Sequence, residues 1–299
     1  MELIARAHAS LHYGSIPSLD RRERTLGSMA MNLSIAVVTY QSRAVIEPCL
    51  TSLYDGDEPL QFEVLVIDNG STDGTAECIA SKFPGVRLIL NRQNEGLAKA
   101  VNLAFQQSSG TYFLVLNPDI EVCRGAISAL LSAMQSDPRI GLCAPKLLNI
   151  DGTLQHSCRR YYTLYTLLLR RTFLRRMFPD HQAVRHHLMM EWDHATCREV
   201  EWVLGAAFIL RRDAIRDREL MDKNFFLYFE DVDLCLRLRK DGWKVIYLPD
   251  AVMIHHHQRA SARGAWNRAK LEHLKSWLKF SWKHRHEPLL RISRNKLGN

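Results

Sequence analysis

Hydrophobic residues in the first half of the chain gather in short continuous runs, separated by segments with a different periodicity. Four of these runs, rich in Val, Ile and Leu, are Leu33–Val38, Phe62–Ile67, Val86–Leu90 and Tyr112–Leu116. Continuous apolar runs of this length are typical of parallel strands that are covered on both faces. They predict a sheet buried between two layers.

Apolar residues at helical spacing mark the segments between these runs. The clearest set follows i, i+3, i+4, i+7, i+8 spacing and comprises Leu97, Ala100, Val101, Ala104 and Phe105. A second set comprises Ile127, Leu130, Leu131 and Met134. Strands that alternate with helices predict an α/β fold with a doubly wound, mostly parallel sheet. In such sheets, ligands bind beyond the carboxyl ends of the strands.

Polar segments follow each of the four predicted strands. They are TYQS (39–42), DNGSTDGT (68–75), NRQNEGLAKAVN (91–102) and NPD (117–119). Neither GxGxxG nor GxxxxGK followed by Ser or Thr occurs in the chain, which disfavours a dehydrogenase or a P-loop enzyme. The small, polar and acidic residues at these positions indicate another kind of ligand site.

The second half of the chain has a different pattern. Residues 199–215, EVEWVLGAAFILRRDAI, predict a further buried strand with Gly205 at a tight point. Residues 225–257 begin with four aromatic residues directly before three carboxylates, within 225–233, and end with three adjacent histidines. A solvated helix does not need the aromatics and a buried helix disfavours the carboxylates, so this stretch is a candidate site. Gly242 fits the end of a helix, and WKVIYLP (243–249) predicts a strand.

The two ends of the chain differ from its centre. Residues 1–30 lack periodicity and are expected to form a poorly ordered extension, residues 31–258 one domain, and residues 259–299 a basic tail with amphipathic helices. The formal net charge is +8, and residues 265–299 hold nine Lys or Arg against two acids, 9 − 2 = +7. The remainder is close to neutral, which argues against a nucleic-acid binder.

Cysteine usage and hydropathy bear on the compartment. The seven cysteines form no CxxC pair and are irregularly spaced, as expected of reduced thiols in a cytosolic protein. The first thirty residues lack the apolar core of a secretory signal, and the longest apolar run, Trp202–Leu210, is too short to cross a bilayer. The protein is therefore expected to be soluble or peripheral to a membrane.

Six segments, taken in order, resemble one family. They are VVTY, VIDNGSTDGT, NEGLAKAVN, LNPD, WVLGAAFILRR and the block FFLYFEDVDLCLRLRKDGWKVIYLPDAVMIHH. From about Leu33 to His257 the chain resembles inverting glycosyltransferases of family 2 with the GT-A fold, most closely the rhamnosyltransferase-like branch. The resemblance implies a nucleotide-binding N-terminal half and an acceptor-binding C-terminal half. It also implies sugar transfer from a nucleotide diphosphate sugar, dTDP- or UDP-linked, to an acceptor hydroxyl.

The resemblance assigns donor-binding residues to the strand ends. They are Thr39, Tyr40, Asp68, Asn69, Ser71, Asn94, Gly96, Lys99, Asn117 and Asp119. Asp68 matches the residue that receives the nucleotide base; as a helix cap it is less well placed than Thr72 or Asp73. Residues 94–102 surround a helix start, a natural anion site, where Lys99 either offsets diphosphate charge or faces solvent.

The resemblance also implies a divalent metal, Mg²⁺ or Mn²⁺. Asp119 ends a DxD-like motif in which Asn117 replaces the first Asp, leaving one charge fewer for the metal. His255, 24 residues after Asp231, matches a histidine that completes the metal site in related enzymes. His256 is the alternative, because strand alternation puts the two on opposite faces.

Asp231 matches the catalytic base of the family. An inverting transfer needs one carboxylate to take the proton of the acceptor hydroxyl. Glu230 and Asp233, at i, i+3, are expected to bind acceptor or to begin the helix, with Trp202 and Gly205 also on the acceptor side. A capped amphipathic helix is the alternative interpretation of this stretch.

The tail places tryptophans and leucines among cationic residues, a pattern of helices that lie on membrane surfaces. Family members of this branch act on lipid-linked saccharides, so a peripheral location at the inner face of the cell membrane is expected, to which residues 159–176 could add. A terminal helix docked on the domain is the alternative. A sugar-nucleotide nucleotidyltransferase is the competing enzyme class, but TYQSRAV lacks the Gly-rich loop with Arg or Lys which that class needs.

Overall fold

The computed structural model describes residues 32–55, 60–163, 181–215, 219–256 and 266–287, with residues 165, 166, 169 and 177. Side chains are described from residue 272 onward in the last of these ranges. The predicted extension, residues 1–30, and much of the arginine-rich stretch 159–176 lie outside this part of the chain.

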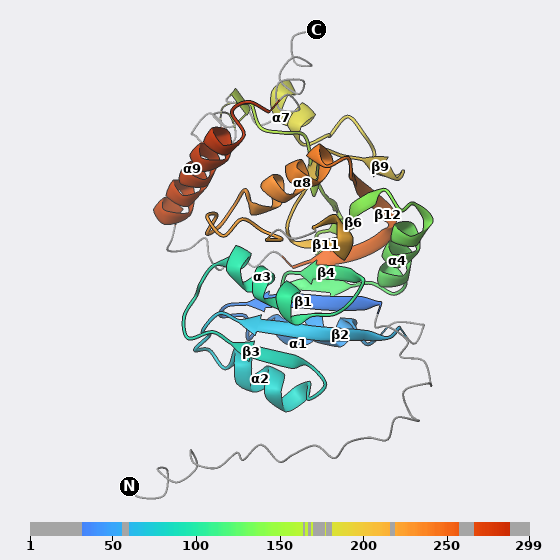
Figure 1. Cartoon of the computed structure of the whole chain (residues 1–299), viewed down its shortest axis with the longest axis vertical. Coiled ribbons are helices and arrows are strands. Elements are labelled where there is room, and N and C mark those ends of the chain that lie inside the picture. The colour runs from blue at the N-terminus through green and yellow to red at the C-terminus, as the bar shows by residue number, and fades with distance from the viewer. Residues whose placement is uncertain are drawn as a thin grey trace, which may run out of the picture. The chain divides into compact units, whose positions relative to one another are not determined.

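A mixed sheet forms the centre of the domain (Figure 1). Its strand order is β3-β2-β1-β4-β11-β6-β12-β5, with β7 paired to β6 and β9 to β12. These strands are β1 Leu33–Thr39, β2 Phe62–Asp68, β3 Arg87–Leu90, β4 Tyr112–Leu116, β5 Ile120–Val122, β6 Ile140–Leu148, β7 Leu154–Gln155, β9 Arg198–Glu199, β11 Ala207–Arg211 and β12 Lys244–His255. A separate ribbon pairs β8 Cys158–Arg159 with β10 Trp202–Val203.

Strand direction divides this sheet into two parts. The four strands β1 to β4 run parallel, with Leu33 opposite Phe62 on β2 and Tyr112 on β4. Next to them, β11 is antiparallel to both β4 and β6, while β6 and β12 are parallel to each other. The prediction of a doubly wound, mostly parallel sheet is confirmed, and the antiparallel β11 joins its two parts.

Helices cover both faces of the sheet, as the periodicity predicts. They are α1 Ile46–Ser52, α2 Thr75–Lys82, α3 Leu97–Gln107, α4 Ala126–Ser136, α7 Gln182–His187, α8 Glu230–Lys240 and α9 Trp266–Lys283, with a short 3₁₀ turn at Arg212–Ala214. Gly242, at φ +85°, follows the end of α8 as predicted, because glycine adopts this left-handed conformation without steric cost.

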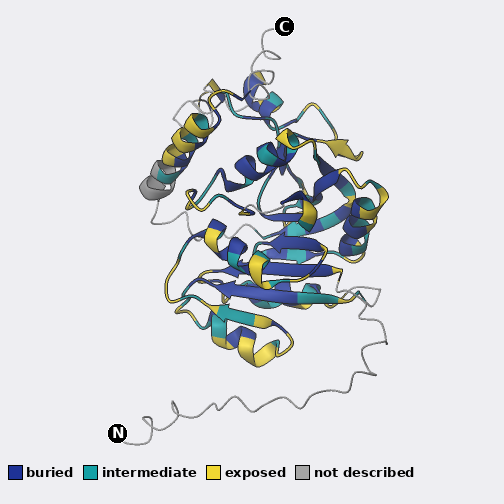
Figure 2. Ribbon diagram, in the orientation of Figure 1, coloured by how far each residue is buried: buried dark blue, intermediate teal, exposed yellow. Residues whose placement is uncertain are grey.

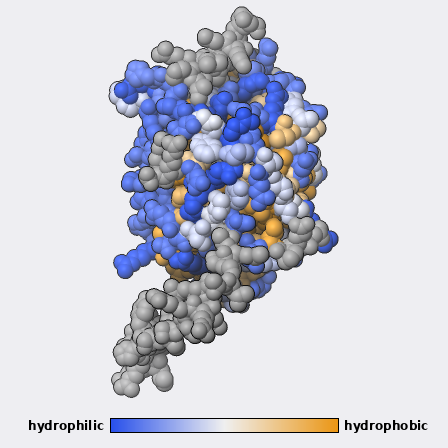
Figure 3. Space-filling model, turned by 45° about the vertical axis from the view of Figure 1, so that its right-hand side comes forward, coloured by the Kyte–Doolittle hydropathy of each residue, from blue (hydrophilic) through white to orange (hydrophobic). Residues whose placement is uncertain are grey.

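Two hydrophobic clusters result, one on each face (Figure 2). Alternate residues of a strand contribute to opposite clusters: Ala36 and Val38 pack with α3 and α8, whereas Ile35 and Val37 pack with α1, α2 and α4. The predicted strands are thus buried on both sides. The molecular face in Figure 3 is mostly hydrophilic, with apolar side chains confined to smaller patches.

Two predictions about single elements are corrected by the structure. Residues 199–215 are not one strand, because they divide among β9, β10 of the separate ribbon and β11 of the central sheet, with residues 204–206 between the last two. The tail is not a separate element throughout, since Phe280 of α9 is part of the core cluster that contains α3 and α8. Within the described residues, no helix is both long and apolar enough to span a bilayer. All seven cysteines are free thiols, and five of them are buried.

Candidate active site

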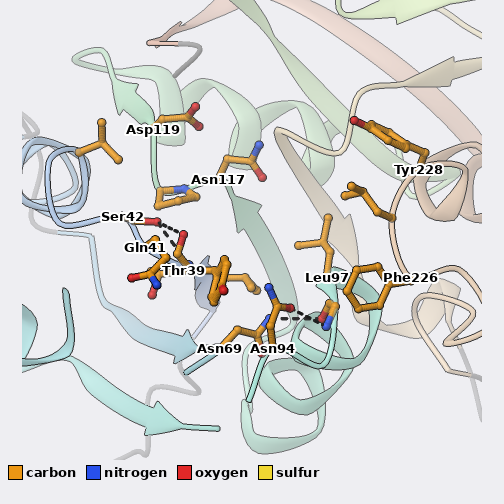
Figure 4. Close-up of a pocket in the computed structure, with 16 residues that line it drawn as sticks. Thr39, Gln41, Ser42, Asn69, Asn94, Leu97, Asn117, Asp119, Phe226 and Tyr228 are labelled. Carbon is orange, nitrogen blue, oxygen red and sulfur yellow. Dashed lines mark hydrogen bonds between the residues drawn. The ribbon is translucent and has the colours of Figure 1, made fainter. Parts of the chain in front are cut away.

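A cavity of about 610 Å³ opens at the carboxyl ends of the parallel strands (Figure 4). One wall consists of strand-end residues and the opposite wall of the segment that precedes α8. The lining residues are Val38, Thr39, Tyr40, Gln41, Ser42, Val45, Asn69, Asn94, Gly96, Leu97, Asn117, Pro118, Asp119, Phe226, Leu227 and Tyr228. Seven of the ten predicted donor-binding residues are among them.

The ends of β1 and β2 are joined by the carboxylate of Asp68. One of its oxygens accepts a hydrogen bond from the Thr39 hydroxyl at 2.8 Å, and the other accepts from the amides of Gly70 and Ser71. Asp68 is buried beneath the cavity rather than in its lining. Ser71 also lies outside the lining, and its hydroxyl accepts from the amide of Gln41. These two residues shape the turn, and their contact with a nucleotide stays a prediction.

Asn94 and Gly96 form the start of α3 at the floor of the cavity. The Asn94 side chain accepts from the Gly96 amide at 2.9 Å. Gly96 has φ +87°, and a Cβ there would stand 2.9 Å from both the ring and the carbonyl oxygen of Phe226. Only glycine therefore lets the aromatic wall come this close. Lys99 lies outside the lining and pairs with Glu95 at 3.2 Å, so the structure does not bring it to the cavity.

Asp119 lines the other end of the cavity and contacts His255, which is buried outside the lining. The Asp119 carboxylate lies 3.3 Å from Nε2 of His255, whose Nδ1 is 2.9 Å from the side-chain oxygen of Gln155. A carboxylate and an imidazole oriented by a second polar group fit a divalent ion that takes its other ligands from phosphate oxygens or water. His256 instead points to Glu121, as strand alternation predicts. No group of three or more protein ligands occurs within the described residues.

Asp231 begins α8 beyond the aromatic wall. Its side chain accepts hydrogen bonds from the amides of Gly205 at 2.9 Å and Val232 at 2.8 Å. Burial raises the pKa of Asp231, while these two amides and the charge of Arg159 act in the opposite direction. Gly205, predicted on the acceptor side, thus contacts the predicted base directly. The break between β10 and β11 is what turns its amide toward α8.

Glu230 shares the buried surroundings of Asp231. Burial, and secondarily the charge of Asp231, raises the pKa of Glu230 to about 8. Its Oε2 has no hydrogen-bond partner among the described residues. Two amides donate to Asp231 and none offsets burial at Oε2 of Glu230, so the pair favours a proton on Glu230 over one on Asp231.

Two predicted acceptor residues point away from the cavity. Trp202 is buried and donates its indole N–H to the carbonyl oxygen of Arg160, while the guanidinium of Arg159 stacks over its ring. Asp233 is fully buried and faces α9, where it pairs with Lys283 and His284. Neither side chain is exposed to bind an acceptor in this structure.

The sequence alone does not show that several of the lining residues lie at the cavity. Gln41 has φ +53° and is held by Thr72, whose amide donates to it and whose hydroxyl accepts from it. Phe226 and Tyr228 reach the cavity from the far half of the chain (Figure 4). The aromatic cluster was recognisable as unusual, but its position opposite the strand ends depends on long-range packing.

Comparison with known proteins relates most of the chain to glycosyltransferases. The profile described as "Glycosyl transferase family 2" matches residues 34–190, and "Glycosyl transferase family group 2" matches residues 152–283. An N-acetylglucosaminyl-diphospho-decaprenol L-rhamnosyltransferase of Mycobacterium tuberculosis is 30% identical over 263 residues, covering 84% of this chain and 85% of its own. The O-antigen biosynthesis protein RfbC of Myxococcus xanthus is also 30% identical, over 88% of this chain but only 20% of its own.

Solved structures share the fold at low identity. A mannosyltransferase from Pyrobaculum calidifontis in complex with GDP-Man and Mn²⁺ has a TM-score of 0.58 at 19% identity, covering 88% of this chain and 69% of its own. GalNAc-T7 with UDP, GalNAc and Mn²⁺ has a TM-score of 0.57 at 16% identity, covering 77% and 45%. Both likenesses concern the GT-A fold alone.

Proposed function

The chain belongs to glycosyltransferase family 2, and from this premise we propose that it transfers L-rhamnose from a nucleotide diphosphate sugar to a saccharide on a lipid diphosphate. The observation that carries the choice of substrates is the 30% identity to an L-rhamnosyltransferase that extends over most of both chains. The cavity at the strand ends is the matching donor site. Synthesis of a cell-surface polysaccharide is the process that such a product would serve.

The donor would lie along the strand ends. Thr39 and Tyr40 at the end of β1, with Asn69 after β2, form the part of the cavity assigned to the base and ribose. Asn94, Gly96, Asn117 and Asp119 then follow toward the diphosphate. A dTDP- or UDP-linked donor fits a site of amides, hydroxyls and a buried carboxylate, because these groups match the hydrogen-bonding edge of a pyrimidine.

Asp119 and His255 would hold Mg²⁺ or Mn²⁺ against the donor diphosphate. Their separation of 3.3 Å and the orientation of His255 by Gln155 support this assignment. When bound, the ion supplies positive charge that stabilises the departing diphosphate. Within the described part of the chain no residue that lines the cavity is a lysine or arginine, and Lys99 pairs with Glu95 outside the lining.

Asp231 would act as the base of an inverting displacement. It takes the proton from an acceptor hydroxyl as that oxygen forms a bond to the anomeric carbon. The bond from that carbon to the diphosphate oxygen breaks, and the diphosphate leaves with the electron pair. The amides of Gly205 and Val232 fix the carboxylate, and burial raises the pKa of the neighbouring Glu230, which favours a proton there over one on Asp231.

The outer surface of α9 would lie on the cytoplasmic face of the cell membrane. Leu274, Leu278 and Trp282 recur at i, i+4, i+8 and are 47%, 54% and 72% exposed. Lys275, Lys279 and Arg285 are exposed near this stripe. An apolar stripe beside cations fits the boundary of an anionic bilayer, and it would bring a lipid-linked acceptor to the enzyme.

A direct assay tests the substrates. The purified full chain is incubated with dTDP-rhamnose, UDP-glucose or GDP-mannose, with Mn²⁺, and with N-acetylglucosaminyl diphosphate on a short polyprenyl chain. Transfer of rhamnose in preference to the other sugars is expected. Equal or greater transfer of a hexose would overturn the choice of sugar, and rhamnosylation of the free saccharide alone would overturn the lipid-linked acceptor.

A further inference from the structure

The helix α9 packs one face directly against the segment that leads into the candidate base. His273, Ser276, Phe280 and His284 recur at i, i+3, i+7, i+11 and are all buried. The opposite face carries the exposed stripe of Leu274, Leu278 and Trp282. The inner face therefore has a defined partner, which is the chain between Asp222 and Asp233.

This segment adopts a conformation that its residues disfavour. Tyr228 and Phe229 have φ of +70° and +71°, a left-handed pair without glycine. Such a pair persists only where the surroundings hold it. Phe226, Leu227 and Tyr228 line the cavity, and Glu230 and Asp231 follow immediately. The position of both the aromatic wall and the base depends on this turn.

Contacts from α9 hold the turn at its centre. The Ser276 hydroxyl donates to the carbonyl oxygen of Leu227 at 2.9 Å. The ring of His273 lies 5.2 Å from that of Tyr228 and 5.1 Å from that of Phe229. The Phe280 ring lies 5.4 Å from the Phe229 ring. Hydrogen bonding and ring packing thus both act on the two left-handed residues.

Ionic contacts from the end of α9 hold both ends of the segment. The Lys283 ammonium lies 2.6 Å from the carboxylate of Asp222 and 2.7 Å from that of Asp233. Nε2 of His284 lies 2.7 Å from the same Asp233 oxygen, and Arg237 pairs with the other at 2.8 Å. A fully buried carboxylate with three such neighbours is held firmly in place, because removing one partner leaves its charge poorly compensated.

We propose that α9 is a positioning helix for the acceptor side of the active site, with Ser276, Lys283 and His284 as its positioning residues. They fix the 222–233 segment, and through it the aromatic wall and Asp231. The expected loss of transfer rate rests on the proposed function, whereas the expected change in hydrogen exchange does not. The surface proposed to contact lipid and the residues that hold the active-site wall therefore belong to the same helix.

Three variants of the full chain test this role. Lys283→Met removes both ionic contacts, Ser276→Ala removes one hydrogen bond, and Lys283→Arg keeps the charge. Lys82→Met is the matched control, since it removes an exposed pair between Lys82 of α2 and Glu47 of α1. Hydrogen exchange of the 222–233 segment is measured without substrate, followed by dTDP affinity and rhamnose transfer.

Lys283→Met and Ser276→Ala are expected to speed exchange in residues 225–231 by roughly tenfold, while exchange in β1 and β4 stays unchanged. Transfer kcat should fall by a similar factor and dTDP affinity by less, because the strand-end wall of the cavity is unchanged, and Lys283→Arg should restore most of both. Unchanged exchange in Ser276→Ala, or equal losses of dTDP affinity and kcat, would overturn the proposal. If the wild type transferred no sugar while the variants still showed faster exchange, the positioning role would stand and the proposed function would be refuted.

Discussion

Two adjacent carboxyl groups at the start of α8 have different partners: Glu230 is buried, whereas Asp231 is half-buried. Asp231 accepts hydrogen bonds from the amides of Gly205 and Val232, which favour its ionised form. Oε2 of Glu230 has no partner within the described part of the chain, and burial raises the pKa of Glu230 to about 8. These contacts favour a proton on Glu230 over one on Asp231, which is the distribution that a base at Asp231 requires.

Replacing Asp231 tests this assignment. Asp231→Asn keeps an oxygen for the Gly205 amide but cannot take a proton. We expect kcat for transfer to fall by about 10²–10⁴-fold while donor affinity is nearly unchanged, because only the transition state uses the base. Transfer rates and donor binding by calorimetry provide the measurement. A variant with more than about a tenth of wild-type turnover would contradict the role of Asp231.

The raised pKa of Glu230 has a consequence for stability. The folded chain binds this proton more tightly than the unfolded chain, so stability falls as pH rises from about 4.5 toward about 8. Glu230→Gln removes this loss, and we expect its Tm to exceed that of the wild type by roughly 3 °C or more at pH 9, with little difference at pH 4.5. Thermal unfolding followed by circular dichroism measures both values.

The exposed Glu77 on α2 offers the control for this comparison, since Glu77→Gln changes no buried group. Its Tm should follow the wild type across the same pH range. If Glu230→Gln and Glu77→Gln behaved alike, Glu230 would titrate as a solvated carboxyl, and the proton on the pair would have to be assigned differently.

At the scale of elements, strand register explains how two distant residues form the candidate metal site. His255 at the end of β12 lies opposite Ile120 of β5, the residue that follows Asp119. The next residue, His256, pairs with Glu121 instead. The two histidines therefore form a natural pair of variants.

We expect His255→Ala to lower donor affinity by roughly tenfold in Mn²⁺ and to leave the weaker affinity in chelator unchanged. His256→Ala should retain wild-type affinity in both conditions. Calorimetric titration of the donor into each variant, with and without the ion, measures this directly. Full turnover of the wild type in excess chelator, or equal losses in the two variants, would argue against a metal held by Asp119 and His255.

The predictable elements were those specified by local pattern. The four parallel strands begin and end within one residue of the predicted limits, because residues buried on both faces leave a continuous apolar run. The run 199–215 has the same appearance but breaks at Gly205, whose amide bonds to a carboxylate 26 residues later. No local signal reports such a contact. The antiparallel direction of β11 could not be predicted from its own residues either, because the direction of a strand is defined relative to its neighbours in the sheet.

The residues of the candidate site also fall into two groups, those that local pattern predicts and those that it does not. Thr39, Asn94, Asn117 and Asp119 follow strands, so the topology alone brings them together. Phe226 and Tyr228 complete the cavity through packing against Gly96 and α9, which the sequence does not display. Asp233 is a residue that the sequence assigns to the site and the structure does not. Its place near Asp231 suggested an acceptor contact, whereas helical rotation turns it toward Lys283 and His284.

At the scale of the whole molecule, the docking of α9 changes what removal of the tail would do. A chain cut after His257 would lose Phe280 from the core and leave Asp233 buried without Lys283 and His284. Such a truncation confounds membrane contact with stability. Substitutions on the outer face separate the two, because Leu274, Leu278 and Trp282 point away from the domain.

The triple variant Leu274→Ser, Leu278→Ser, Trp282→Ser should therefore fold normally and lose the salt-resistant part of membrane binding. We expect the wild type to sediment with vesicles that contain anionic lipid and to be partly released by salt. Charge attraction of about 1 kcal/mol per Lys or Arg is screened by salt, whereas the apolar contact is not. The triple variant should sediment weakly at low salt and not at all at high salt, while rhamnose transfer to a water-soluble short-chain acceptor continues. Equal sedimentation of the two proteins would show that α9 does not form the membrane contact. Loss of transfer to the soluble acceptor would show that these three side chains also serve the inner contacts of the helix.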